Sequence, residues 1–241
     1  MSKYLSHDKW KCMLHKDKID VLYSGVPQGF YLLLQSPSCE RCSSQGKSTG
    51  DCDWHARFDP SLKRVYAVGT YFEGGNSLVN GDILSTHIWR LKFWSSDYAK
   101  PLGIGMAIVG KSLYSNLTRC DMIVPVPPFE RSKSYDHADE LATAVAGLLG
   151  IPLKRLLSKT REEKMVKKAS VEERWKASEN LYVMVGRESE SDNKTILLVD
   201  DICTSGATLS GCSRALSSQG KAREVYALVA GRRYDERYPI K

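Results

Sequence analysis

The sequence has no apolar run long enough to cross a membrane, and its first residues lack the apolar core of a secretion signal. We therefore expect a cytoplasmic protein without a membrane span. The missing signal also argues against disulfides, because these form mainly in oxidising compartments. The chain nevertheless has seven cysteines, and metal ligation explains them better than a disulfide framework does.

Positive charge is in excess, with a formal net charge of +7. Such an excess favours polyanionic partners, either nucleic acid or phosphorylated substrates. A solvated lysine-rich surface without such a partner would give the same net charge. At 241 residues the chain is long enough for one main domain with a small appendage. We place the appendage at residues 1–60 and the main domain at residues 61–241.

The stretch Thr195–Leu209 is the most informative part of the chain. Its apolar run Ile196–Val199 is too short for a helix and is typical of a strand that is buried on both faces. Two carboxylates, Asp200 and Asp201, follow at the end of that strand. Small and hydroxyl-bearing residues come next and lead into a helical pattern that ends at Gly220. The sequence therefore predicts a strand, a loop and a helix in succession.

This arrangement suits a phosphate group with sugar hydroxyls beside it. A loop that enters a helix presents free backbone N–H groups and the positive end of the helix dipole. Gly206 lets the backbone approach a ligand. The hydroxyl donors of the loop are Thr204, Ser205 and Thr208. The two aspartates can accept hydrogen bonds from hydroxyls or hold a hydrated divalent cation. The alternative is a buried strand before an ordinary capped helix.

A CxxC pair and a CxxH pair lie close together in the first quarter of the chain. The four residues are Cys39, Cys42, Cys52 and His55. This spacing is typical of a structural zinc site, in which four ligands complete a tetrahedron and replace a core that is too small to form alone. Unrelated thiols are the alternative. Cys12 and His15 are spaced like a helical ligand pair, but nothing near them completes a site, and we expect residues 1–20 to be an ordinary surface segment.

The remaining patterns indicate an α/β fold. We expect short strands at residues 21–23 and 30–34, a hairpin over residues 62–76 that turns at Gly69, a helix from Pro101, an edge strand at 121–128, a helix from His137 and a buried strand at 225–230. Two strand–loop–helix units argue for a parallel sheet with helices across its faces. Residues 158–180 read as a charged loop or a hood over a site, or else as a solvated surface hairpin.

The stretch around Asp200 resembles the signature of type I phosphoribosyltransferases, and the whole chain resembles the ComF family of competence proteins. Besides the cysteine module, the matching segments are Tyr71-Phe72-Glu73-Gly74, Leu91-Lys92-Phe93, Val124-Pro125-Val126-Pro127 and Tyr135-Asp136-His137-Ala138-Asp139-Glu140-Leu141-Ala142. Three features differ from the family pattern, and one is the glutamine expected in the mobile loop, in whose place stands Lys164 or Lys167. His55 stands where a fourth cysteine is usual, and Phe129–Lys133 replaces a His-Pro-Lys-Arg segment.

The resemblance implies a phosphoribosyltransferase-like parallel sheet with flanking helices, plus a small amino-terminal zinc-binding module. It implies that phosphoribosyl pyrophosphate (PRPP) binds with Mg²⁺ at Asp200 and Asp201, which are also the expected catalytic residues. Further residues expected to contact PRPP are Thr204, Ser205, Gly206, Ala207 and Thr208. Arg131 and Lys133 are candidates for pyrophosphate contacts. The expected reaction displaces pyrophosphate at the anomeric carbon of the ribose through an oxocarbenium-like state.

The family also implies a link to DNA uptake, which leaves two functional hypotheses. The first is a phosphoribosyltransferase whose acceptor the sequence does not identify. The second is a non-catalytic module that senses PRPP or a nucleotide and binds single-stranded DNA or a DNA-processing protein.

Overall fold

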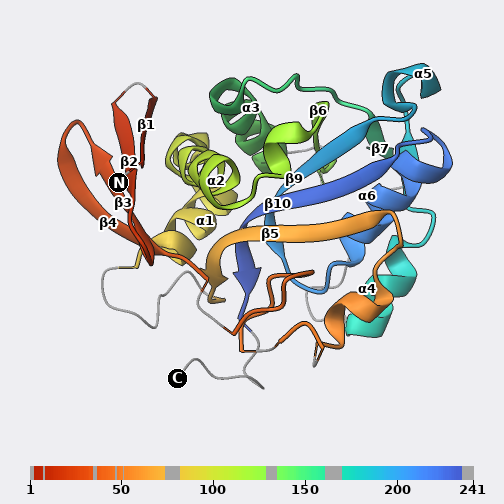
Figure 1. Ribbon diagram of the computed structural model, residues 1–241, viewed down its shortest axis with the longest axis horizontal. Helices are drawn as coiled ribbons and strands as arrows, with labels where there is room; N and C mark the ends of the chain where they lie inside the picture. Colours follow the sequence, from red (N-terminus) through yellow and green to blue (C-terminus); the bar gives the residue numbers. More distant parts are fainter. Residues whose placement is uncertain are drawn as a thin grey trace.

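The structure is a computed structural model that describes residues 3–7, 9–34, 37–46, 48–50, 52–73, 82–128, 135–160 and 170–234. Two sheets dominate it, a small antiparallel sheet at the amino terminus and a larger parallel sheet with helices on both faces (Figure 1). The α/β parallel fold expected from the sequence is therefore confirmed. Within the described residues, no helix combines the length and apolarity needed to cross a membrane.

The strands are β1 (Lys3–His7), β2 (Trp10–Leu14), β3 (Lys18–Tyr23), β4 (Val26–Leu32), β5 (Leu62–Tyr71), β6 (Met122–Pro125), β7 (Leu157–Lys159), β8 (Tyr182–Met184), β9 (Thr195–Cys203) and β10 (Glu224–Arg233). The helices are α1 (Leu84–Phe93), α2 (Ala99–Leu113), α3 (His137–Leu149), α4 (Val171–Ser178), α5 (Glu188–Ser191) and α6 (Ala207–Ser218).

The parallel sheet has the order β5-β10-β9-β6, with β9 in an interior position. The four residues of β9 from Ile196 to Val199 are all fully buried. Leu197 and Val199 belong to one hydrophobic core, and Ile196 and Leu198 belong to the other. The strand buried on both faces is therefore confirmed, and β6 lies at the sheet edge, where its prolines cost no ladder hydrogen bonds.

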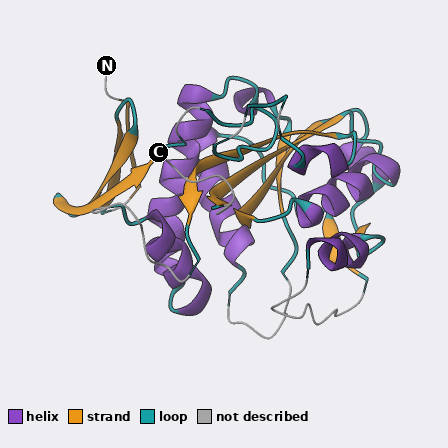
Figure 2. Cartoon of the chain, turned by 90° about the horizontal axis from the view of Figure 1, so that it is seen from below, coloured by secondary structure: helices purple, strands orange, loops and turns teal. Residues whose placement is uncertain are grey.

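The two faces of the parallel sheet carry different helices (Figures 1 and 2). Helices α1, α2 and α3 contribute to the core on one face, whereas α6 and the cysteine-containing segment contribute to the core on the other. Helix α3 has the ends that its sequence predicts. Asp136 accepts hydrogen bonds from the backbone N–H groups of Ala138 and Asp139, and Gly150 closes the helix with φ of 70°.

The amino-terminal prediction was wrong in an informative way. Residues 1–20 were expected to form a surface segment, but β1 and β2 belong to a four-stranded antiparallel sheet that packs on α2. Cys12 is fully buried in β2, and His15 pairs with Asp20 at 2.7 Å. Alternating burial along β2 and β3 places every second residue toward α2. Neither Cys12 nor His15 belongs to the cluster of possible metal ligands found among the described residues.

The predicted hairpin over residues 62–76 was also wrong over its described part, since β5 runs without a turn from Leu62 to Tyr71. Gly69 lies within the strand because the chain passes close to it. A Cβ at this position would lie 2.1 Å from the carbonyl oxygen of Leu32. The glycine therefore serves close packing and not a turn.

The segment at residues 158–180 is partly helical, because α4 starts with a capping box in which Ser170 and Glu173 bond each other's backbone N–H groups. Residues 161–169 of this segment lie outside the described part of the chain.

Candidate functional site

The acidic pair lies at the carboxyl end of the parallel sheet. Strand β9 continues through both aspartates to Cys203, which is further than the apolar run predicts. Asp201 is 7% exposed and Asp200 is partly buried. The adjacent strand β10 and, beyond it, β5 end at the same edge of the sheet, with Tyr71 paired to Arg233. Several chain segments therefore meet at this edge, as parallel strand ends do in α/β folds.

Lys92 completes the acidic site from another element. Its Nζ atom, near the end of α1, lies 3.2 Å from Oδ2 of Asp201. Burial alone would lower the pKa of Lys92, but Asp201 and Asp200 outweigh it and raise the pKa, so the ammonium stays charged. His137, the first residue of α3, places Nδ1 3.7 Å from the same carboxylate oxygen. In the sequence Lys92 was named only within the matching segment Leu91-Lys92-Phe93, and this segment was the available signal.

Asp200 has a raised pKa. Burial, reinforced by the charge of Asp201, raises the pKa of Asp200 to about 8. Burial likewise raises the pKa of Asp136, which lies close enough to Asp201 for their charges to repel. Three carboxyl groups thus share this region with one ion-paired lysine. Bound cations or donor hydroxyls would relieve the repulsion.

The loop after the acidic pair ends in a left-handed glycine at the start of a helix. Gly206 has φ of 85°, a value that favours glycine, and α6 begins at the next residue. Ser205 is buried, and its Oγ accepts a hydrogen bond from the backbone N–H of Ala207 at 3.3 Å. Thr204 and Thr208 are partly exposed. The amino end of a 12-residue helix and two accessible threonines therefore adjoin the carboxylates.

The predicted pyrophosphate contacts, Arg131 and Lys133, lie outside the described residues. A cation that the sequence did not single out does lie in the region. Lys159 lies at the end of β7. Burial lowers the pKa of Lys159, and attraction to the nearby Asp200 and Asp136 opposes this shift. Together with Lys92, this residue supplies positive charge near the acidic pair.

The four predicted metal ligands lie together. One donor atom from each of Cys39, Cys42, Cys52 and His55 falls within 4.8 Å of all the others. Sγ of Cys39 is 3.2 Å from Nδ1 of His55, and the sulfur atoms of Cys42 and Cys52 are 3.4 Å apart. A hydrogen bond from Cys42 helps to lower the pKa of Cys39 to about 4. Three thiols and one imidazole at this separation suit a tetrahedral zinc ion.

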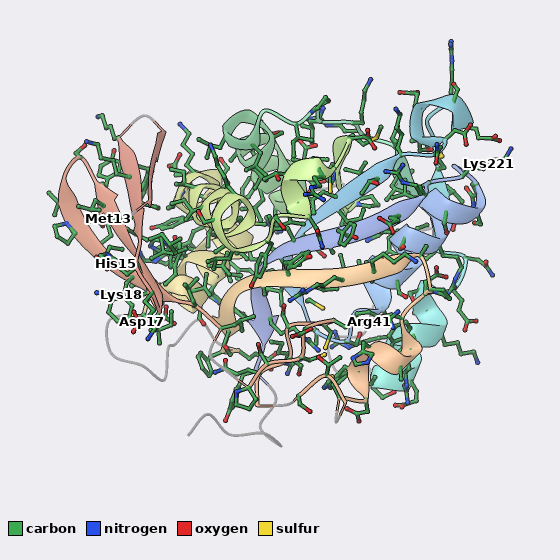
Figure 3. All side chains as sticks on the ribbon, viewed as in Figure 1. Met13, His15, Asp17, Lys18, Arg41 and Lys221 are labelled. Carbon is green, nitrogen blue, oxygen red and sulfur yellow. The ribbon has the colours of Figure 1, made fainter. Side chains whose placement is uncertain are left out.

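The cluster lies against the large sheet and not against the amino-terminal one. In Figure 3, Arg41, within the CxxC pair, lies beneath β5, whereas His15 lies on the small sheet. The backbone carbonyl of Arg41 accepts a hydrogen bond from Val65 in β5, and Ser43 donates to the carbonyl of Val65. The cysteine segment therefore covers the β5 edge of the sheet.

Purified protein is expected to carry about one equivalent of zinc, because one tetrahedral ligand set is present. Metal analysis by mass spectrometry measures this value directly. Cys52→Ala should lose most of the metal and lower the melting temperature, since three ligands bind zinc less well than four. Cys120→Ala is the matched control, because Cys120 is buried but lies outside the cluster. Equal zinc content in the two variants would contradict the assignment.

Two sequence comparisons relate the chain to known proteins. Residues 121–240 match the phosphoribosyl transferase domain family. The chain is 23% identical over 223 residues to competence protein F of Haemophilus influenzae, a match that covers 88% of this chain and 92% of that protein.

Two solved structures show weaker likenesses. A purine phosphoribosyltransferase from Pyrococcus horikoshii has 18% identity and a TM-score of 0.34, over 58% of this chain and 92% of that one. Glutamine PRPP amidotransferase from B. subtilis has 16% identity and a TM-score of 0.36, over 90% of this chain and 37% of that one. At these TM-scores the two likenesses carry no inference about the site.

Proposed function

We propose that the chain, which is similar to competence protein F and whose residues 121–240 match the phosphoribosyl transferase domain family, binds PRPP and transfers its phosphoribosyl group with release of pyrophosphate. One observation carries the proposal. An acidic pair near the end of an interior parallel strand is followed, after a short loop, by a positive-φ glycine at a helix amino terminus. A ribose 5-phosphate needs these two features side by side, acceptors for its hydroxyls and donors for its phosphate.

Each half of the site has a distinct task. The backbone N–H groups and hydroxyls from Thr204 to Thr208 would bind the 5-phosphate, and Asp200 and Asp201 would accept hydrogen bonds from the ribose hydroxyls. Mg²⁺, when bound, would be held beside the aspartates and would neutralise the pyrophosphate leaving group. The carboxylates also stabilise positive charge that develops on the ribose ring during displacement.

Lys92 would act as a charge-balancing residue of the free site. Its ion pair with Asp201 keeps that carboxylate compensated before ligand arrives. The ammonium can turn toward pyrophosphate oxygens once the aspartate is engaged by hydroxyls or cation, because lysine is a flexible point charge. The lysine therefore has a role in both states of the site.

PRPP with Mg²⁺ is expected to bind more tightly as the pH rises from about 7 to about 9. The pKa of Asp200 is raised to about 8, so the side chain is largely protonated at neutral pH. It must lose this proton before the carboxylate can accept hydrogen bonds from hydroxyls or approach a cation. Calorimetric titrations near neutral pH, in buffers with different ionisation heats, count the released protons. Asp200→Asn should release fewer protons than the native protein. Equal proton release would contradict this assignment, since titration of the ligand is common to both proteins.

Pyrophosphate release tests transfer itself. Native protein with PRPP and Mg²⁺ is mixed with a panel of nucleobase, amine and hydroxyl acceptors, and acceptor-dependent pyrophosphate is measured. Asp201→Asn is the inactive control. Release that depends on an acceptor and on Asp201 supports the transferase. PRPP binding without release from any acceptor supports the sensing module instead.

The sensing module has one further observation in its favour. Phe93 and Trp94 follow Lys92 and are 61% and 64% exposed, and exposed aromatics beside cations suit stacking on single-stranded nucleic acid. This second proposal predicts binding of single-stranded DNA that weakens steeply with salt and with Trp94→Ala. Binding that is unchanged by either would count against it.

A further inference from the structure

Arg232 is a buried cation that the proposed reaction does not use. It lies near the end of β10 and is only 2% exposed. Its Nε atom has no hydrogen-bond partner among the described residues. A buried guanidinium is costly unless nearby groups compensate its charge. The surroundings of Arg232 therefore indicate what it does.

On one side, Arg232 holds the loop that precedes α6. Its Nη1 donates to the backbone carbonyl of Cys203 at 2.7 Å and also to that of Thr204. These carbonyls stand between the acidic pair and Gly206. One guanidinium nitrogen thus fixes the direction of the backbone just where the phosphate-binding part of the loop starts.

On the other side, Arg232 faces the metal-ligand cluster. Its guanidinium carbon lies 5.5 Å from the ring centre of Trp54, the residue before the ligand His55. Arg232 is also close enough to Cys42 to interact with it electrostatically. Three thiolates around a divalent ion would leave one net negative charge, which one guanidinium balances. The side chain thus links the metal centre to the loop.

A second contact joins the same two parts of the molecule. The backbone N–H of Phe58 donates to the carbonyl of His55 at 3.1 Å, so the ligand segment positions this ring. The ring of Phe58 packs under the loop so closely that a Cβ on Gly206 would lie 2.3 Å from it. The metal-ligand segment therefore supports the loop at two places, through Arg232 and through Phe58.

We propose that Arg232 is a positioning residue that couples metal occupancy of the cysteine cluster to the affinity of the loop for the 5-phosphate of PRPP. The affinity part rests on the proposed function. With zinc bound, the segment from Cys39 to His55 is held in place, and Trp54 and Phe58 keep their contacts. Without zinc the four ligands no longer hold the segment together, and the loop loses part of its support.

The test compares Arg232→Gln with Arg223→Gln by calorimetry with PRPP and Mg²⁺. Arg223 is the matched control, because it bonds Thr195 at the opposite end of the sheet. Arg232→Gln should keep its zinc and bind PRPP about tenfold more weakly, the loss expected for a charge-assisted hydrogen bond. Zinc chelation should weaken binding by the native protein to a similar extent and add little to Arg232→Gln.

Hydrogen exchange of residues 203–208 supplies a readout that needs no ligand. Chelation should speed exchange in the native protein, whereas Arg232→Gln should exchange fast with or without zinc. If PRPP does not bind the native protein but this zinc-dependent exchange is seen, the proposed function fails and the coupling stands. If exchange and affinity respond to zinc equally in Arg232→Gln and native protein, the coupling is wrong. If Arg232→Gln does not fold, Arg232→Lys replaces it in the same assays. Lysine keeps the positive charge but lacks the forked donors of the guanidinium, so an intermediate effect is expected. Native behaviour of Arg232→Lys would overturn the proposal.

Discussion

Replacing both Asp200 and Asp201 by asparagine is expected to weaken PRPP binding by about a hundredfold or more, because two charge-assisted interactions are lost. Asparagine keeps the size of each side chain but removes the negative charge that would attract Mg²⁺ and accept ribose hydroxyls. Calorimetric titration with PRPP and Mg²⁺ measures the loss. Asp121→Asn is the matched control, since Asp121 accepts a hydrogen bond from Thr195 at the far end of the sheet.

The double variant should remain folded, and this separates loss of binding from loss of structure. Folding raises the pKa of Asp200 to about 8, so above about pH 4 this group ionises in the unfolded state but stays protonated in the folded state. The free energy of unfolding therefore falls progressively as the pH rises from about 4 through about 8. An asparagine side chain at this position would not ionise and would avoid that cost. The melting temperature of Asp200→Asn should therefore equal or exceed the native value at alkaline pH. Native affinity in the double variant would refute the assignment of the acidic pair.

Gly206→Ala is expected to weaken PRPP binding at least about tenfold and to cost roughly 1–3 kcal/mol of stability. Two effects act together. A Cβ at φ of 85° is strained, and it would lie 2.3 Å from the ring of Phe58. Either the loop or the ring must move, and movement of the loop displaces the N–H groups proposed to bind phosphate. Thermal unfolding and calorimetry measure the two quantities.

Comparison with Gly150→Ala separates the effect of the clash with Phe58 from the effect of backbone strain. Gly150 also has positive φ, at 70°, but a Cβ there would meet no atom within 4 Å. This variant should lose stability through backbone strain and keep its affinity for PRPP. Equal PRPP affinities in Gly206→Ala and the native protein would show that the loop does not bind the ligand in the manner proposed.

Local pattern was sufficient to predict the central part of the fold. The apolar run Ile196–Val199 is short and rich in Leu and β-branched residues, and it forms an interior strand with every residue buried. Helix α3 runs from His137 to Leu149 because strong capping residues, Asp136 and Gly150, flank its two ends. The grouping of the four metal ligands also followed from spacing, since CxxC and CxxH pairs each bring two donors to one turn.

Other features depend on contacts between distant segments, which local pattern does not reveal. Gly69 resembles a turn residue until the backbone of Leu32 passes close to it. Lys92 resembles a surface lysine until the sheet brings Asp201 to within 3.2 Å. Arg232 and Phe58 show their relation to the loop only because β10 and the cysteine segment converge there. The positions and roles of the residues around the site thus depended on tertiary packing more than on local secondary-structure propensity.

Calorimetric titration of the native protein, purified with zinc in the buffer, with PRPP, with and without Mg²⁺, tests the central claim most directly. The account predicts saturable binding at about one site per chain, which is strengthened by Mg²⁺ and is competed by ribose 5-phosphate, since one loop and one acidic pair form the site. The absence of saturable binding by folded protein at millimolar PRPP with Mg²⁺ would contradict it.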